Sequence, residues 1–290
     1  MPAYTEGNLS QNFMQELLGY PSKLAHIPGG QISFREAGQD RKDAIPLVLL
    51  HGIGSGAASW SKQLDSVGQA RRVVAWDAPG YGESTPVKPC VPVAADYAEV
   101  LFAWLETIEI DRCVMVGHSL GAIIAGGFAL AHGSKLAGLL LLSPARGYGN
   151  ASAEVRDGKR NGRLEMLRTL GPEGLARERS SNMLSSAASD EARLFVHWNM
   201  SKVVPEGYEQ ATHLLANADL AADISRFRGR IAVAVGAEDT ITPASACEPV
   251  ARAAGVALQI VPQAGHAGYI ELPGVYSNLI ETFCRTCESW

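Results

Sequence analysis

The sequence predicts an α/β protein built on a doubly wound, mostly parallel sheet. Short segments that are wholly apolar recur along the chain, as at 47–50, 73–76 and 136–142. Such segments are typical of parallel strands that are covered on both faces. Between them lie segments with apolar residues at helical spacing, for example 94–108. This alternation predicts parallel strands that are connected by helices packed on both faces of the sheet.

The individual elements follow from the period of the apolar residues and from the Gly and Pro residues between them. An amphipathic helix is expected within residues 1–22, where Leu9, Phe13, Leu17 and Leu18 have helical spacing. Strands are expected at 25–27, 31–37, 47–50, 73–76, 112–116, 136–142, 231–235 and 256–261, and helices at 58–67, 94–108, 122–131, 242–254 and 274–284.

Residues 145–218 differ in character from the chain on either side. This stretch is rich in arginine and shows helical periodicity without a strand. We therefore expect two parts, a core domain made of residues 1–144 and 219–290 and a helical lid made of residues 145–218.

Composition and charge restrict the class of protein. The chain has 290 residues and a net charge of −5, which argues against nucleic acid and anionic membrane surfaces as partners. No apolar run approaches the roughly 20 residues of a membrane span, and no signal peptide is evident, so a cytoplasmic enzyme is expected. Cys284 and Cys287 are interpreted as ordinary helix residues rather than metal ligands. A homo-oligomer is compatible with the sequence.

The most informative motif is Gly-His-Ser-Leu-Gly at 117–121, between an apolar strand and an apolar helix. A serine at such a strand–turn–helix junction has an exposed hydroxyl on a strained backbone, which predicts Ser119 as a nucleophile. Gly117 and Gly121 are expected because a Cβ atom would collide with the neighbouring strand and helix. The Leu120 amide would then face a developing oxyanion. The alternative is that Ser119 simply caps the helix.

A glycine-rich loop, His-Gly-Ile-Gly-Ser-Gly at 51–56, follows the strand at 47–50 directly. Glycine frees backbone amides to approach a ligand closely, and the Ile53 amide is the candidate for a second oxyanion donor. A flexible loop without such a role is the alternative.

A serine nucleophile needs a general base that is oriented by a third group. Of the seven histidines, only His266 follows a late strand, in a loop at the edge where ligands bind to open α/β sheets. Two carboxylates, Glu238 and Asp239, follow the strand at 231–235; we expect Asp239 to be the partner, with Glu238 as the alternative. Asp77 precedes a Pro-Gly turn and is interpreted as a turn-stabilising residue.

With the expected order Ser119, Asp239, His266, the sequence resembles the α/β-hydrolase superfamily. The resemblance rests on the motif at 117–121, the His-Gly loop, the Asp-x-Pro-Gly-x-Gly-x-Ser turn at 77–84 and the Gly-His-x-x-x-x-Glu-x-Pro motif at 265–273. It implies an eight-stranded sheet with a lid after the sixth strand. The serine is unlike the aspartate of the dehalogenase and epoxide hydrolase branches.

Within the superfamily the sequence is most similar to small esterases, enol-lactonases and hydrolases that cleave a carbon–carbon bond of meta-cleavage products. The carbon–carbon hydrolases typically carry a tryptophan just after the catalytic histidine, where this chain has Ala267. The expected reaction is therefore hydrolysis of a small-molecule ester or lactone, without metal or organic cofactor. Carbon–carbon cleavage of a vinylogous diketo acid is the alternative, and a non-catalytic receptor on this fold is a second one.

Two residues of the expected lid are candidates for substrate binding. Arg146 follows the sixth predicted strand and is suited to pairing with a substrate carboxylate, although a solvated arginine fits the same position. Trp198 is a candidate for the wall of the substrate pocket, and packing within the lid explains it equally well.

Overall fold

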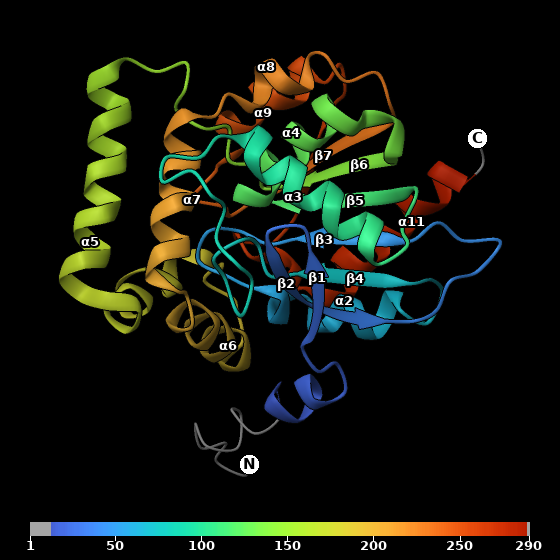
Figure 1. Ribbon diagram of the computed structural model, residues 1–290. Helices are drawn as coiled ribbons and strands as arrows, with labels where there is room; N and C mark the ends of the chain where they lie inside the picture. Colours follow the sequence, from blue (N-terminus) through green and yellow to red (C-terminus); the bar gives the residue numbers. More distant parts are fainter. Residues whose placement is uncertain (1–12, 289–290) are drawn as a thin grey trace, which may run out of the picture.

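An eight-stranded sheet forms the centre of the structure, a computed structural model that describes residues 13–288 (Figure 1). The strands are β1 (Lys23–Ile27), β2 (Gly30–Ala37), β3 (Leu47–Leu50), β4 (Val73–Trp76), β5 (Cys113–His118), β6 (Leu136–Leu142), β7 (Ile231–Gly236) and β8 (Leu258–Val261). Their spatial order is β1-β2-β4-β3-β5-β6-β7-β8. Only the pairs β1–β2 and β2–β4 are antiparallel. The predicted fold class is confirmed.

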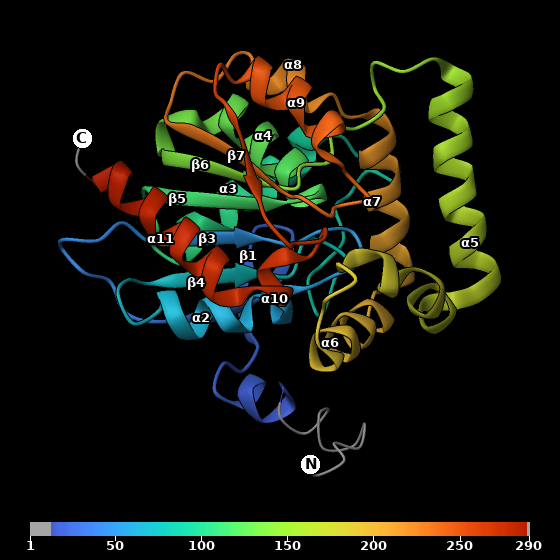
Figure 2. The ribbon, with the colours of Figure 1, turned by 180° about the vertical axis from the view of Figure 1, so that it is seen from behind.

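Helices cover both faces of this sheet (Figures 1 and 2). One face carries α3 (Ala94–Thr107), α4 (Leu120–His132), α8 (Leu220–Ile224) and α9 (Ala244–Ala253), and the other carries α2 (Ser61–Val67) and α11 (Pro273–Glu288). In β3, Val48 and Leu50 pack on the α3–α4 side, whereas Leu47 and Leu49 pack on the α2–α11 side. Burial on both faces is the physical reason why this strand has no polar residue.

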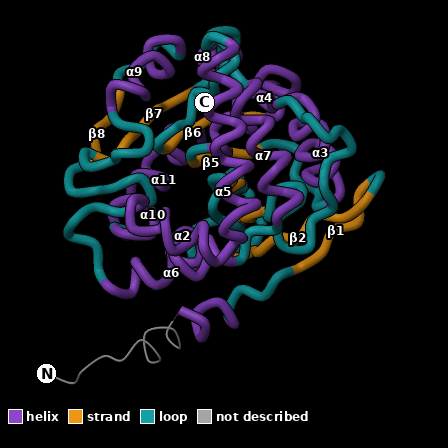
Figure 3. Tube along the Cα trace, turned by 90° about the vertical axis from the view of Figure 1, so that its left-hand side faces the viewer, coloured by secondary structure: helices purple, strands orange, loops and turns teal. Residues whose placement is uncertain are grey.

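Residues between β6 and β7 form helices and contain no strand, and all of them are described. Besides α8, the helices of this segment are α5 (Ala153–Arg179), α6 (Asp190–Ser201) and α7 (Pro205–Asn217), with a 3₁₀ turn at Ser180–Met183. Helix α5 is bent at Gly171, which has φ +64° and precedes Pro172. Pro172 has no N–H to continue the helical ladder, so the helix continues in a new direction. Figure 3 looks at this end of the molecule and shows α5 and α7 side by side in front of the sheet.

Some boundaries differ from those expected. The predicted helix at 58–67 begins as a 3₁₀ turn, Ala57–Trp60, and the short helices α8 and α10 (Gly268–Glu271) are not evident from the sequence because each has only about one turn. Residues 13–18 are helical. Phe13 and Leu17 are buried there but Leu18 is 70% exposed, whereas Leu9 lies outside the described residues.

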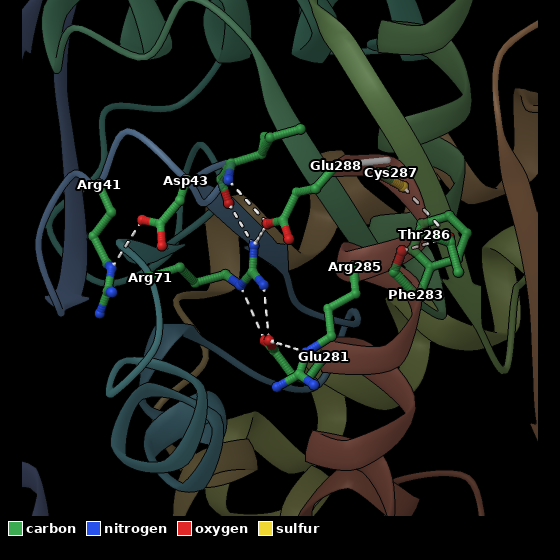
Figure 4. A network of polar contacts seen from close by, with 10 residues as sticks. Arg41, Asp43, Arg71, Glu281, Phe283, Arg285, Thr286, Cys287 and Glu288 are labelled. Atoms are coloured by element: carbon green, nitrogen blue, oxygen red, sulfur yellow. Dashed lines mark hydrogen bonds and ion pairs between the residues drawn. The ribbon is translucent and has the colours of Figure 1, made fainter. Parts of the chain in front are cut away.

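A buried arginine fixes the C-terminal helix to the sheet domain (Figure 4). The Arg71 side chain is only 2% exposed and donates two hydrogen bonds to Glu281, at 2.9 and 3.0 Å. It also donates to the Ile45 carbonyl at 3.0 Å and pairs with Glu288. Removing one partner of such a network leaves an uncompensated buried charge, so the end of α11 is held firmly.

Candidate active site

A cavity of about 450 Å³ lies between the carboxyl ends of the strands and helices α5 to α7. Loops that follow β3, β5, β6, β7 and β8 line it, together with side chains of the helices between β6 and β7. The predicted site residues that reach this cavity are Ile53, Ser119, Leu120, Arg146 and His266. Parallel strands bring these residues from distant parts of the sequence to the carboxyl edge of the sheet, where ligands bind to open α/β sheets.

Ser119 lies at the turn between β5 and α4 with φ 54° and ψ −113°. This positive φ is costly for a residue with a side chain and is maintained only by the surrounding structure. A Cβ atom on Gly117 would lie 2.6 Å from the Gly121 carbonyl oxygen, and one on Gly121 would lie 2.4 Å from the Leu50 carbonyl oxygen. Only glycine fits at both positions, so the turn depends on them.

Ile53 and Leu120 both line the cavity that contains Ser119, Ile53 in the loop after β3 and Leu120 at the start of α4. Neither amide has an acceptor among the loop and turn hydrogen bonds of residues 13–288. The Tyr81 hydroxyl donates to the Ile53 carbonyl at 2.8 Å and fixes the conformation of this loop. Both residues therefore bring a backbone amide without a loop or turn acceptor to this cavity.

Asp239 and His266 are in direct contact. The His266 Nδ1 atom lies 2.9 Å from Asp239 Oδ2, and both side chains are buried. Asp239 Oδ1 accepts the amides of Ile241 at 2.9 Å and Thr242 at 2.8 Å. Burial works to raise the pKa of Asp239, but the hydrogen bond and charge of His266 and the Thr242 amide outweigh it. The pKa is held well below its usual range, so Asp239 is ionised and orients His266.

The other two carboxylates considered from the sequence lie elsewhere. Glu238 is exposed, and its Oε2 atom lies 3.4 Å from both the amide nitrogen and the hydroxyl of Ser186. Asp77 accepts the Ala57 amide and the Ser33 hydroxyl, each at 2.8 Å. Of the three carboxylates, only Asp239 contacts His266.

Sequence reasoning missed the part played by His118. Its Nε2 atom donates to the His266 carbonyl oxygen at 2.8 Å, which connects the Ser119 turn to the loop that carries His266. Burial, aided by the nearby His266, lowers the pKa of His118 to about 3, so the ring is neutral. Its position next to Ser119 in the sequence was visible, but its partner 148 residues away was not.

The helical segment between β6 and β7 is hydrogen-bonded to the loop that carries His266. The Ala267 amide donates to the Met183 carbonyl at 2.7 Å. The Glu271 carboxylate accepts the amides of Gly265, at 2.9 Å, and Ser185, at 3.1 Å. Glu271 belongs to the 265–273 motif, so this motif links the His266 loop to the helices that cover it.

The two candidates for substrate binding have different surroundings. Arg146 is exposed and lines the cavity. Trp198 is not among the residues that line it; its ring lies 5.4 Å from Phe13 and 5.8 Å from Phe195, centroid to centroid. The lining residues of that helix are instead Val196, Asn199 and Met200. We therefore assign Trp198 to packing and leave it out of the proposed substrate site.

Comparison with known proteins agrees with this architecture. The profile of the alpha/beta hydrolase family matches residues 47–278. The chain therefore belongs to the alpha/beta hydrolase family.

Proteins of similar sequence include a lipase and an acyltransferase. A (lyso)-N-acylphosphatidylethanolamine lipase of Mus musculus is 32% identical over 108 residues, which are 36% of this chain and 32% of that protein. A 1-acylglycerol-3-phosphate O-acyltransferase, ABHD5 of Rattus norvegicus, is 30% identical over 102 residues, 34% of this chain and 29% of that protein. The match thus spans about a third of the length of these relatives.

Solved structures match along nearly the whole chain. A thermophilic esterase from Thermogutta terrifontis has a TM-score of 0.81 at 23% identity and covers 92% of this chain and 99% of its own. The enol-lactonase from Burkholderia xenovorans LB400 has a TM-score of 0.79 at 20% identity, with 90% and 99% covered. These likenesses establish the fold. Within residues 13–288, no helix is both long and apolar enough to cross a membrane.

Proposed function

We propose that the protein is a serine hydrolase that cleaves a small-molecule carboxylic ester or lactone through an acyl-enzyme. One observation carries the proposal: the cavity contains Ser119 on its strained turn and His266, which the buried Asp239 holds at 2.9 Å. Nucleophile, base and orienting acid are the set that acyl transfer to water requires.

The reaction follows from these positions. His266 takes the proton of Ser119 as its oxygen attacks the ester or lactone carbonyl, and the amides of Leu120 and Ile53 stabilise the oxyanion. His266 then protonates the leaving oxygen and later activates the water that hydrolyses the acyl-enzyme. Asp239 holds the proton on Nδ1 of His266 and stabilises the ring when it becomes charged.

In this proposal residues 145–218 act as the lid of a core formed by residues 1–144 and 219–290. The cavity lies between the two parts, and the contacts of Glu271 with Gly265 and Ser185 support a lid that rests on the His266 loop. Arg146 would contact the substrate at the exposed rim. The proposal also includes a cytoplasmic location and a small-molecule substrate.

Carbon–carbon cleavage of a vinylogous diketo acid is the second candidate, because the cations at the cavity suit an acidic substrate. Against it, Ala267 lies where the enzymes of that type typically have a tryptophan. The small Ala267 side chain is buried beside His266 and also lines the cavity.

A substrate panel with purified protein tests the proposal. The panel contains p-nitrophenyl esters of increasing acyl length, a series of lactones and one vinylogous diketo acid. We expect turnover of esters or lactones above that of the diketo acid, and its loss in Ser119→Ala. Turnover of the diketo acid alone would favour the second candidate. No turnover and no labelling by a fluorophosphonate would favour a receptor.

A further inference from the structure

Four arginines of helix α5 differ in their partners. Arg160 pairs with Asp157 at 3.1 Å, and the exposed Arg168 pairs with Glu165 at 2.6 Å. Arg163 and Arg179 line the cavity, and neither has an acidic partner among residues 13–288. The charges of Arg160 and Arg168 are therefore balanced within the helix, whereas the two arginines at the cavity have no counter-charge among the described residues.

The bend of α5 explains how both of these arginines reach one cavity. Arg163 shares a helix face with the buried Leu167, four residues later, so this face is directed inward. Arg179 follows the bend at Gly171 and belongs to the second segment of the helix. A straight helix would separate residues 16 positions apart by about 24 Å along its axis.

The charges of the two guanidinium groups act on each other. Burial is the largest influence on Arg179 and lowers its pKa, and the charge of Arg163 lowers it further. Tyr148 and Tyr208, which also line the cavity, act in the opposite direction on Arg179. Two like charges that are half-buried together are costly unless an anion lies between them.

The charged side chains that line the cavity are all cationic, whereas the net charge of the chain is negative. Its lining includes Arg146, Lys159, Arg163 and Arg179, and its described residues include no aspartate or glutamate. The chain carries a net charge of −5. A cavity lined by one sign of charge attracts and concentrates a ligand of the other sign.

We propose that Arg163 and Arg179 form an oxyanion-binding subsite, so that the natural substrate is an ester or lactone carrying a carboxylate or phosphate group. This arginine pair would hold the charged group while the acyl carbonyl lies at Ser119, because two guanidinium groups bind such oxyanions through paired hydrogen bonds. The statement that the substrate is an ester or lactone rests on the proposed function. The statement that the cavity binds an oxyanion rests on the arginine pair alone.

Matched substrates test the inference. Mono-p-nitrophenyl glutarate and p-nitrophenyl pentanoate have the same acyl length and differ in one carboxylate, and p-nitrophenyl 4-phosphonobutanoate replaces that carboxylate by a phosphonate. We expect wild-type kcat/KM to favour an anionic ester at least tenfold. Arg163→Gln and Arg179→Gln should each reduce the anionic-to-neutral ratio about 10- to 100-fold, the scale of a hydrogen bond between charged groups. The carboxylate and phosphonate arms identify the preferred oxyanion.

Arg168→Gln is the control, because Arg168 lies on the same helix but pairs with Glu165 and is 75% exposed. It should leave the ratio within twofold of wild type. Arg146→Gln, at the exposed rim, should lower the ratio less than about fivefold, since an exposed charge pair contributes little. Equal kcat/KM for neutral and anionic esters in the wild type, or equal losses for both in the arginine variants, would overturn the inference.

A binding measurement separates this inference from the proposed function. Glutarate and inorganic phosphate are titrated into the wild type and the two arginine variants by calorimetry. Binding of either anion to the wild type and its loss in Arg163→Gln and Arg179→Gln supports the subsite, even if no ester is hydrolysed and the proposed function fails. Ester hydrolysis without anion binding and without a preference for anionic esters contradicts the subsite and leaves the hydrolase intact.

Discussion

Glycine has opposite meanings at the turn that carries Ser119 and in the first part of helix α5. At Gly117 and Gly121 a Cβ atom would lie within 2.6 Å of a backbone oxygen. At Gly158 and Gly162, in α5, a Cβ atom would meet nothing within 4 Å. The first pair is required by close packing around Ser119, whereas the second pair has no such requirement. The Ser119 turn is therefore sensitive to substitution at its glycines, and the first part of α5 is expected to tolerate substitution at Gly158 and Gly162.

The largest effect is expected at the nucleophile of the core. Ser119→Ala removes the attacking oxygen and should lower kcat by about 10⁴-fold or more, because the members of a triad act as a unit. Ester hydrolysis and the thermal unfolding midpoint are measured together. Hydrolysis above a few per cent of wild type, with an unchanged midpoint, would exclude Ser119 as the nucleophile.

The next largest effect is expected at Asp239, and its neighbour Glu238 provides the comparison. Asp239→Asn should lower kcat by about 10³- to 10⁴-fold, because the amide no longer holds His266 with the proton on Nδ1. Glu238→Gln should retain activity within about threefold, because Glu238 contacts only Ser186 of the helical segment. The comparison uses kcat on one ester, and the reverse ranking would mean that the acid is Glu238.

Alanine substitutions at Gly121 and Gly158 test directly whether the two glycines have different roles. Gly121→Ala should destabilise the protein by about 1–3 kcal/mol, because the added Cβ overlaps the Leu50 carbonyl. Gly158→Ala should stabilise it by about 0.5–1 kcal/mol, because alanine favours the helix and finds open space. Urea unfolding measures both. Similar effects of the two substitutions would remove the distinction between the regions.

The smallest effect concerns pH and the neutral His118. Its pKa falls from 6.5 to about 3 on folding, so between these values the unfolded chain binds the extra proton and the folded chain does not. The free energy of unfolding should therefore fall as the pH is lowered from 6.5, by at most about 1.4 kcal/mol per pH unit from this group. Urea unfolding at pH 7 and pH 5 should show a shallower dependence in His118→Gln. An unchanged pH dependence in His118→Gln would contradict this assignment.

Sequence reasoning succeeded where chemistry demands particular residues at short spacing. The apolar strands and the motif around Ser119 fixed the fold class, and strand ends singled out Asp239 and His266, which the structure brings into contact. The surroundings of the cavity were less accessible. In the sequence, Arg163 does not differ from the other arginines of a charged helix, and only the structure shows that it lines the cavity. The contact of His118 with the His266 carbonyl spans 148 residues. Such features depend on tertiary packing, which periodicity does not encode.

Covalent labelling of Ser119 tests the central claim most directly. A fluorophosphonate forms a stable adduct with an activated serine, and peptide mapping by mass spectrometry identifies the residue. We expect one adduct, on the peptide that contains Ser119, its absence in Ser119→Ala and much slower labelling in Asp239→Asn. An adduct on another serine, or ester hydrolysis by protein whose Ser119 is never labelled, would contradict it.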